Sequence, residues 1–316
     1  MDLSLSILQI AAGVLLLYVG AEGLVRGSAE LALRFGLSPL VVGLTVVALG
    51  TSSPELVVTM QAAMKGNGDI AVGSVVGSNI SNLALILGAT VLLRPLAIRK
   101  ELVALDMPIV IACSLMLLAM LLNGRLERWE GLILIAGLGA FLLFNGWRAP
   151  EGEPALVSGP IRLTPRLREG LPWLSILFTV GGLALLILGA EILLEGAIAV
   201  AEILGISQAV IGLTLVAVGT SLPELATTTV AALKREADLA VGNLIGSNVL
   251  NVLGVLGIST LVSPLRSHGV RIADLGVMIG VAVLTLVLMR TGFRLRRLEG
   301  ALLVGLYGSY IWYLTY

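Results

Sequence analysis

The sequence predicts an all-α integral membrane protein in which ten transmembrane helices form two inverted repeats of five helices each. Three observations support this fold class: the apolar composition, the number of apolar segments and a long internal repeat. The chain has 316 residues, of which 57% are hydrophobic and only 13% are charged, and its mean hydropathy is +1.03. A soluble domain needs more polar surface than this, so most of the chain must lie within a membrane, in contact with lipid.

Composition also argues against several classes of function. The formal net charge is zero, which gives no reason to expect nucleic acid as a partner. The single histidine, His268, argues against a histidine-ligated metal centre, and the single cysteine, Cys113, cannot form a disulfide within the chain. No nucleophile–histidine–acid arrangement and no nucleotide-binding loop is evident, so we expect neither an enzyme nor a cofactor. No feature indicates an obligate protein partner.

The ten spans follow from segments of about twenty or more apolar residues, the length that crosses the hydrocarbon core. The first half of the chain contains five of them, at residues 5–33, 38–64, 69–93, 101–122 and 126–147. The second half contains five more, at residues 171–203, 207–232, 238–262, 270–290 and 294–315. The first and sixth spans are long enough to lie tilted. The initial MDLSLS has no basic residue, so the first segment is predicted to be a span and not a cleaved signal.

A polar connection divides the chain into two halves. Residues 148–170 are rich in proline, glycine and arginine and form a predicted cytoplasmic linker, too short to hold a folded domain. The first five-helix repeat therefore covers residues 1–147, with its repeated motifs at 43–96. The second covers residues 171–316, with its repeated motifs at 212–265.

Lysine and arginine residues in the connections predict the orientation, because cytoplasmic loops carry an excess of these residues. In the ten-span topology, 15 of the 20 basic residues fall on one face, which includes the linker. The other five are Lys65, Arg125, Arg128, Arg266 and Arg271. The richer face is therefore predicted to be cytoplasmic, and both termini are predicted to be extracytoplasmic.

The two halves of the chain are similar to each other in sequence. Residues 43–96 align with residues 212–265 without a gap, at an offset of 169, with about half of the positions identical. Because each half has an odd number of spans, the second half enters the membrane from the opposite face, so the repeat is inverted. Inverted repeats are typical of secondary transporters, in which the substrate site lies at the repeat interface near the bilayer midplane.

A GTSxPE motif occurs once in each repeat, as GTSSPE at residues 50–55 and GTSLPE at residues 219–224. Pro54 and Pro223 have no N–H and crowd the carbonyl four residues earlier, so spans 2 and 7 are predicted to be broken helices. The carbonyls freed just before each proline must then be satisfied by protein, water or an ion.

The glutamate of each motif lies about halfway along its span, at Glu55 and Glu224. A bare carboxylate at that depth costs about 2.5–3.5 kcal/mol on insertion scales. Spans 2, 3, 7 and 8 contain no lysine or arginine, so a cation, or a proton in its absence, is the expected partner. The available carboxylate, hydroxyl, amide and carbonyl oxygens suit calcium, sodium or magnesium, and two glutamates match the charge of one calcium.

A second motif follows in each repeat, GSVVGSNISN at residues 73–82 and GNLIGSNVLN at residues 242–251. Its GxxxG glycines let another helix approach closely, so spans 3 and 8 are expected to press against the broken spans. A serine and an asparagine four residues apart share one helix face in each motif, and we expect them to point towards the glutamates: Ser78 and Asn82, and Ser247 and Asn251.

Each of these features also has a purely structural interpretation, since packing glycines, proline kinks and water-facing glutamates all occur without ligands. The presence of both motifs in both halves favours an ion site. Asp69 and Asp238 open spans 3 and 8 and are interpreted as helix-start charges. For Glu22 and Glu191, which match across the repeat, a role on an ion path and a structural hydrogen bond both stay open.

The paired GTSxPE and GSNxxN motifs resemble those of the sodium/calcium exchanger family, within the cation/calcium exchanger superfamily, and the resemblance covers nearly the whole chain. It implies a prokaryotic-type member in an inner or plasma membrane, because the large insert of the eukaryotic exchangers is absent after span 5. It implies that Glu55 and Glu224 are the central calcium ligands, joined by the carbonyls of Thr51 and Thr220. The remaining implied ligands serve sodium or line the middle of the site: Ser52, Ser78 and the Ala48 carbonyl, Ser221, Ser247 and the Ala217 carbonyl, and Asn82 and Asn251.

The resemblance further implies the activity: exchange of about three Na⁺ for one Ca²⁺, by alternating access in which spans 1 and 6 slide across the core. Asn251 stands where the potassium-dependent branch carries aspartate, which argues against potassium transport, and the GNxxE-type motif of the proton-coupled branch is not evident. A Ca²⁺/H⁺ or other divalent cation exchanger on the same scaffold, a passive channel and a non-transporting scaffold stay open as alternatives.

Overall fold

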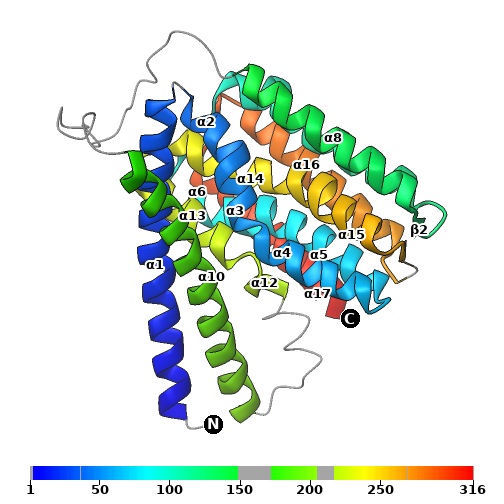
Figure 1. Ribbon diagram of the computed structural model, residues 1–316, viewed down its shortest axis with the longest axis horizontal. Helices are drawn as coiled ribbons and strands as arrows, with labels where there is room; N and C mark the ends of the chain where they lie inside the picture. The colour runs from blue at the N-terminus through cyan, green and yellow to red at the C-terminus, as the bar shows by residue number, and fades with distance from the viewer. Residues whose placement is uncertain (1–2, 36, 149–171, 205–216, 268, 316) are drawn as a thin grey trace.

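The predicted fold class, an all-α integral membrane protein, is confirmed by the computed structural model. The structure describes residues 3–35, 37–148, 172–204, 217–267 and 269–315, and helices account for most of these residues. Figure 1 shows a long pair of helices, α1 and α10, on one side of a bundle, with α8 and α16 on the side remote from that pair.

The first repeat contains spans 1 to 5. Span 1 is α1 (Leu3–Arg34) and span 5 is α8 (Arg128–Trp147). The other spans are interrupted, and η denotes a π-helical segment. Span 2 consists of α2 (Pro39–Val42), η1 (Gly43–Val47), α3 (Ala48–Thr51) and α4 (Ser53–Met64). Spans 3 and 4 consist of α5 (Gly68–Ile80), η2 (Ser81–Ile86) and α6 (Leu87–Leu93), and of η3 (Leu102–Asp106) and α7 (Met107–Leu121).

The second repeat follows the same plan. Its long first helix is α10 (Pro172–Ile203), and its broken span includes α12 (Ala217–Gly219) and α13 (Leu222–Leu233). The next span is continuous through a π segment, with α14 (Ala237–Leu250), η5 (Asn251–Leu256) and α15 (Gly257–Val262). The last two helices are α16 (Ile272–Arg290) and α17 (Arg297–Thr315).

Among the described residues, 7 helical stretches are long and apolar enough to cross a membrane. An eighth is the bent pair Pro39–Thr51 and Ser53–Met64, which meet at 46°. These stretches correspond to predicted spans 1 to 6, 8 and 9. The first part of predicted span 7, residues 205–216, lies outside the described residues, and α17 occupies the place of span 10. The total of ten spans therefore stays a prediction.

Two small antiparallel sheets tie together connections that are distant in sequence. β1 (Leu96–Ala97) pairs with β4 (Arg294–Leu295), and β2 (Arg125–Leu126) pairs with β3 (Leu265–Arg266). The first sheet joins the connections after spans 3 and 9, and the second joins those after spans 4 and 8. In a ten-span topology, the connections after odd-numbered spans lie on one face of the membrane and those after even-numbered spans lie on the other. The two sheets therefore mark opposite faces, here named the β1–β4 face and the β2–β3 face.

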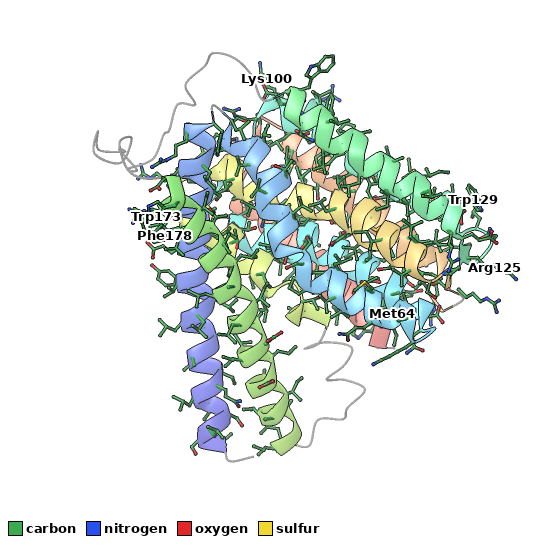
Figure 2. The ribbon with its side chains drawn as sticks, viewed as in Figure 1. Met64, Lys100, Arg125, Trp129, Trp173 and Phe178 are labelled. Carbon is green, nitrogen blue, oxygen red and sulfur yellow. The ribbon has the colours of Figure 1, made fainter. Side chains whose placement is uncertain are left out.

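The hairpins that follow the two broken spans lie on opposite faces, as an inverted repeat requires. The α4–α5 hairpin reaches the β2–β3 face, where Gly68 abuts Arg266 and Asp69 accepts a 2.7 Å hydrogen bond from Gly269 N. Figure 2 shows Met64, at the end of α4, on the same side of the molecule as Arg125 and Trp129, with Lys100 at the other end.

The equivalent α13–α14 hairpin reaches the β1–β4 face. There Arg94 donates a 2.8 Å hydrogen bond to the Leu233 carbonyl, and Arg99 forms a 2.8 Å ion pair with Asp238. Asp69 and Asp238 therefore make contacts near the two faces, at the starts of α5 and α14.

Glycines at every seventh position bring α1 and α10 into close antiparallel contact. The residues are Gly13, Gly20 and Gly27 in α1 and Gly182, Gly189 and Gly196 in α10. A Cβ atom added to Gly20 would lie 2.7 Å from Leu186 N, and one added to Gly27 would lie 2.6 Å from Thr179 N. Larger side chains would force the helices apart, so this glycine seam fixes α1 and α10 against each other. At one end of the seam, Ser175 of α10 donates a 2.9 Å hydrogen bond to buried Glu30.

The GxxxG glycines of the second repeat place α14 against the broken span of the first. A Cβ atom on Gly242 would lie 2.9 Å from the Leu40 carbonyl, and one on Gly246 would overlap the Leu44 carbonyl. This confirms the predicted approach of span 8 to span 2. For the predicted approach of span 3 to span 7, the positions equivalent to Leu40 and Leu44 are residues 209 and 213, which are outside the described part of the chain.

Candidate ion-binding site

The two proline breaks place both motif glutamates in the first turn of a helix. α4 begins at Ser53, after Ser52, and α13 begins at Leu222, after Ser221, each with proline at its N-terminus. Glu55 and Glu224 are the acidic residues of these first turns, and both side chains are fully buried. A helix N-terminus favours negative charge, so the start of a new helix at each break lowers the cost of burying the carboxylate there.

The carbonyls near the first break accept more hydrogen bonds than the presence of the proline alone predicts. Gly50 O accepts a 2.7 Å hydrogen bond from Ser53 Oγ, and Ala48 O accepts one of 3.0 Å from Ser52 N. The Ser53 hydroxyl thus replaces the N–H that Pro54 lacks. Leu222, at the equivalent position of the second repeat, has no hydroxyl and cannot form this bond.

Serines cross between the repeats to reach the glutamates. Ser52 Oγ of the first repeat donates to Glu224 Oε1 at 3.1 Å, and Ser221 Oγ of the second repeat lies 3.2 Å from Glu55 Oε1. Ser52 and Ser221 occupy the same position of the two motifs, so the contacts are equivalent under the internal symmetry. Glu55 and Glu224 therefore belong to one site at the repeat interface.

The serines of the second motif complete the inner part of this cluster. Ser247 Oγ lies 3.4 Å from Glu224 Oε1, and Ser78 Oγ lies 3.4 Å from Ser221 Oγ. All six side chains, those of the two glutamates and four serines, are buried. Ser247 therefore contacts a glutamate directly, whereas Ser78 contacts Ser221, which in turn bonds to Glu55.

Several buried oxygens of the predicted ligands have no hydrogen-bond partner among the described residues. They include the second carboxylate oxygen of each glutamate and the amide oxygens of Asn82 and Asn251. No described lysine or arginine forms an ion pair with Glu55 or Glu224. Buried acceptors of this kind are costly unless a proton or cation satisfies them, and the oxygens present are the ligands that sodium and calcium prefer.

Two asparagines that sequence reasoning missed extend the polar network. Asn243 accepts a 3.1 Å hydrogen bond from Thr51 Oγ1 and donates one of 3.2 Å to Thr228 Oγ1. Asn79 accepts a 3.1 Å hydrogen bond from Asn251 Nδ2 through its own amide oxygen. Asn243 is the second residue of the motif GNLIGSNVLN, and its equivalent in the first repeat is Ser74, so its position in the motif was the available signal.

The π-helical segments were also not predicted. η2 begins at Ser81, directly before Asn82, and η5 begins at Asn251. In such segments each backbone hydrogen bond spans five residues and not four, and they occur often at functional sites. Nothing in the apolar sequence that follows these asparagines distinguishes a π-helix from an α-helix.

The remaining predicted ligands lie at the second break. Ala217 opens α12, and Thr220 follows that helix with a half-buried side chain. Among the described residues, no group of three or more histidine, cysteine, aspartate or glutamate residues could hold a metal ion. Any ion in this site would therefore rely on two carboxylates supplemented by neutral oxygens.

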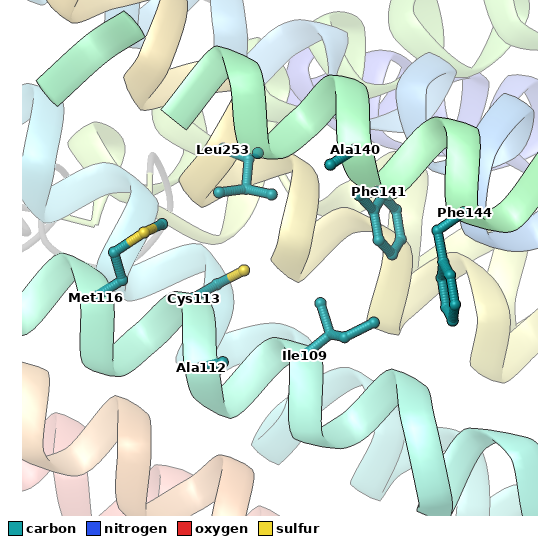
Figure 3. Close-up of a pocket in the computed structure, with 9 residues that line it drawn as sticks. Ile109, Ala112, Cys113, Met116, Ala140, Phe141, Phe144 and Leu253 are labelled. Atoms are coloured by element: carbon teal, nitrogen blue, oxygen red, sulfur yellow. The ribbon is translucent and has the colours of Figure 1, made fainter. Parts of the chain in front are cut away.

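A separate groove of 370 Å³ lies between α7, α8 and η5 and is lined almost entirely by apolar side chains (Figure 3). Cys113 and Met116 contribute from α7, Phe141 and Phe144 from α8, and Leu253 from η5. Its lining offers no carboxylate, so it is unsuited to a cation.

Comparison with known proteins connects this geometry to a family. A family model described as "Sodium/calcium exchanger protein" matches residues 5–147 and 174–316. The chain is 38% identical to the "Putative antiporter CaxA" of Alkalimonas amylolytica, over 92% of this chain and 93% of that protein. It is 31% identical to the "Sodium/calcium exchanger MaX1" of Methanosarcina acetivorans, over 99% of both chains. Its fold matches a solved structure of the sodium-calcium exchanger NCX_Mj with a TM-score of 0.85 and 28% identity, covering 99% of this chain and 100% of the other.

Proposed function

Because this chain belongs to the sodium/calcium exchanger family, we propose that it is a secondary active antiporter that exchanges Na⁺ for Ca²⁺ by alternating access. One observation carries the proposal. Glu55 and Glu224 are buried at the interface of two inverted repeats, and each is bonded by a serine of the other repeat. Each also has a carboxylate oxygen that no described residue hydrogen-bonds.

In this proposal the two glutamates are the central Ca²⁺ ligands, with the carbonyls of Thr51 and Thr220 beside them. The sodium ligands are the hydroxyls and carbonyls on both sides of the glutamates: Ser52, Ser78 and Ala48, and Ser221, Ser247 and Ala217. Asn82 and Asn251 line the middle of the site. Their amide oxygens, which have no hydrogen-bond partner within the described part of the chain, support their inclusion.

Competition for the same two carboxylates provides the coupling. Calcium and sodium both need Glu55 and Glu224, so binding of one ion species excludes the other. Exchange of three Na⁺ for one Ca²⁺ would move one net positive charge per cycle. An empty site carries up to two buried negative charges, whose desolvation opposes the sliding of α1 and α10 across the core, and ion binding removes that penalty.

A Ca²⁺/H⁺ exchanger is the second candidate. It is supported by the absence, among the described residues, of any lysine or arginine paired with the buried glutamates, because protons could then occupy them when calcium leaves. The same residues would bind calcium, and only the coupling ion would differ.

Radioactive calcium uptake into liposomes distinguishes the two candidates. Sodium-loaded proteoliposomes are diluted into sodium-free buffer, with a proton gradient at equal sodium as the parallel arm. We expect uptake that follows the sodium gradient and disappears when sodium is equal on both sides. Uptake driven by protons and indifferent to sodium would support the second candidate and reject sodium coupling.

A further inference from the structure

Two pairs of charged residues outside the ion site match across the repeats. Glu22 is equivalent to Glu191, and Lys65 is equivalent to Lys234, both at the offset of 169. Lys234 Nζ donates a 2.8 Å hydrogen bond to Glu22 Oε1, and this ion pair links α1 to the end of α13. Lys65 and Glu191 are exposed, and neither has an ion-pair partner among the described residues. Of two contacts that are equivalent by symmetry, the structure contains one.

The packing of the helices has the same asymmetry. α1 packs along α13, whereas in the described part of the chain α10 makes no comparable contact with α4, which would be the equivalent pair. The Glu22–Lys234 pair lies near the β1–β4 face, since Leu233, next to Lys234, accepts the hydrogen bond from Arg94. Lys65 lies near the β2–β3 face, close to Gly68. In this structure α1 therefore covers the helix that leads from the site to the β1–β4 face, and α10 does not cover its counterpart.

The glycine seam connects the two sides. α1 and α10 touch backbone to backbone at six glycine positions, so the pair is expected to move as one body. A movement that separates α1 from α13 therefore also displaces α10 relative to α4. Because the repeats are inverted, a second conformation exists in principle in which each half adopts the arrangement that the other has here. In that conformation the contact between Glu22 and Lys234 is replaced by one between Glu191 and Lys65.

We propose that Glu22–Lys234 and Glu191–Lys65 are alternating latches of the transport cycle. The first latch, whose ion pair is formed in this structure, holds the β1–β4 face closed. The second holds the β2–β3 face closed after α1 and α10 have shifted. The inference rests on the alternating access of the proposed function and assigns a role to Glu22 and Glu191, which the ion site does not use. Ion pairs that are partly exposed shift an equilibrium by up to about fivefold, so each latch biases the cycle without arresting it.

Cross-linking in membranes tests whether both latches form. In a Cys113→Ala background, which removes the only native cysteine, cysteines replace one pair at a time: E22C with K234C, or K65C with E191C. A short, reducible bifunctional thiol reagent is then added, since ion-paired residues lie too far apart for a disulfide. Both pairs should cross-link, and the mismatched pairs E22C with K65C and E191C with K234C should not. Cross-linking of the first pair without the second, across sodium-only, calcium-only and ion-free buffers, would overturn the proposal.

A charge variant tests whether the latches oppose each other. Glu22→Gln should raise the initial rate of cross-linking between K65C and E191C by about two- to fivefold, because the opposing latch is weakened. The charge swap E22K with K234E should restore the original rate. Glu195→Gln is the control, since Glu195 is exposed on α10 one turn from Glu191. An unchanged or lower rate in Glu22→Gln would contradict the proposal.

These readouts do not require ion flux. If both pairs cross-link as expected but sodium does not drive calcium uptake, the latches stand and the proposed sodium coupling fails. If sodium drives calcium uptake but only the first pair cross-links, the exchange stands and the latches fail.

Discussion

Ser52 of the first repeat donates a 3.1 Å hydrogen bond to Glu224 of the second, although 172 residues separate them in the sequence. The equivalent contact joins Ser221 to Glu55 at 3.2 Å. Each glutamate is thus oriented by the opposite half of the protein. Both contacts cross the repeat interface, so the geometry of the proposed ion site depends on residues of both halves.

The first prediction concerns the glutamates themselves. Glu55→Gln and Glu224→Gln should each weaken calcium binding by about 100-fold or more, because loss of one partner from a buried charge pair costs about 3–5 kcal/mol. Isotopic calcium binding and uptake measure the effect, with Glu195→Gln as the matched control on an exposed glutamate. Full calcium transport in either variant would show that the substituted glutamate is not a calcium ligand.

The second prediction concerns stabilisation by the ion. Calcium at 100 times its dissociation constant should stabilise the folded protein by about 2.7 kcal/mol, since only the folded state presents the site. Thermal unfolding in detergent should show the increase in melting temperature for the wild type and a much smaller one for Glu224→Gln. Equal stabilisation of both proteins would place the calcium elsewhere.

The third prediction separates two neighbouring serines. Ser52→Ala removes a hydroxyl bonded to Glu224 and should raise the sodium concentration for half-maximal exchange by about tenfold, since hydrogen bonds to charged groups contribute about 1.5–3 kcal/mol. Ser53→Ala is the control: its hydroxyl bonds to the Gly50 carbonyl, so the change should reduce stability with little effect on sodium dependence. Similar sodium dependence in both variants would argue against Ser52 as a sodium ligand.

The fourth prediction tests the packing that positions the site. Gly246→Ala should lower the melting temperature, because its Cβ would overlap the Leu44 carbonyl and overpacking costs about 1–3 kcal/mol. Gly276→Ala is the control, since no described atom lies within 4 Å of a Cβ at that position in α16. The control should keep or raise the melting temperature through better helix propensity. Equal melting temperatures for both variants would contradict the close approach of α14 to η1.

The sequence predicted the features that follow from a simple physical constraint or from the internal repeat. Apolar length predicts the long spans, and the prolines predict the break at Ser52, which the 46° bend confirms. The repeated motifs led to the six buried side chains of the central cluster, because the same residues at equivalent positions of an inverted repeat meet at its interface.

Features that depend on a side-chain conformation or on tertiary contacts were not predictable in this way. The bond from Ser53 to the Gly50 carbonyl replaces the helix bond that Pro54 removes, which the motif alone does not reveal. The contacts of Asn243 with Thr51 and Thr228 depend on how α14 lies against the broken helix. The pairing of Glu22 with Lys234, and not of Glu191 with Lys65, belongs to one conformation of the protein, and a symmetric sequence pattern cannot distinguish between the two.

The most direct test of the central claim is to locate the bound ion. Crystals of the protein grown in calcium, or soaked with strontium, should show one strong anomalous peak within coordination distance of both Glu55 and Glu224, and sodium should displace it. A peak bound elsewhere, or one that persists at full height in the variant Glu55→Gln, would contradict a site shared by the two glutamates.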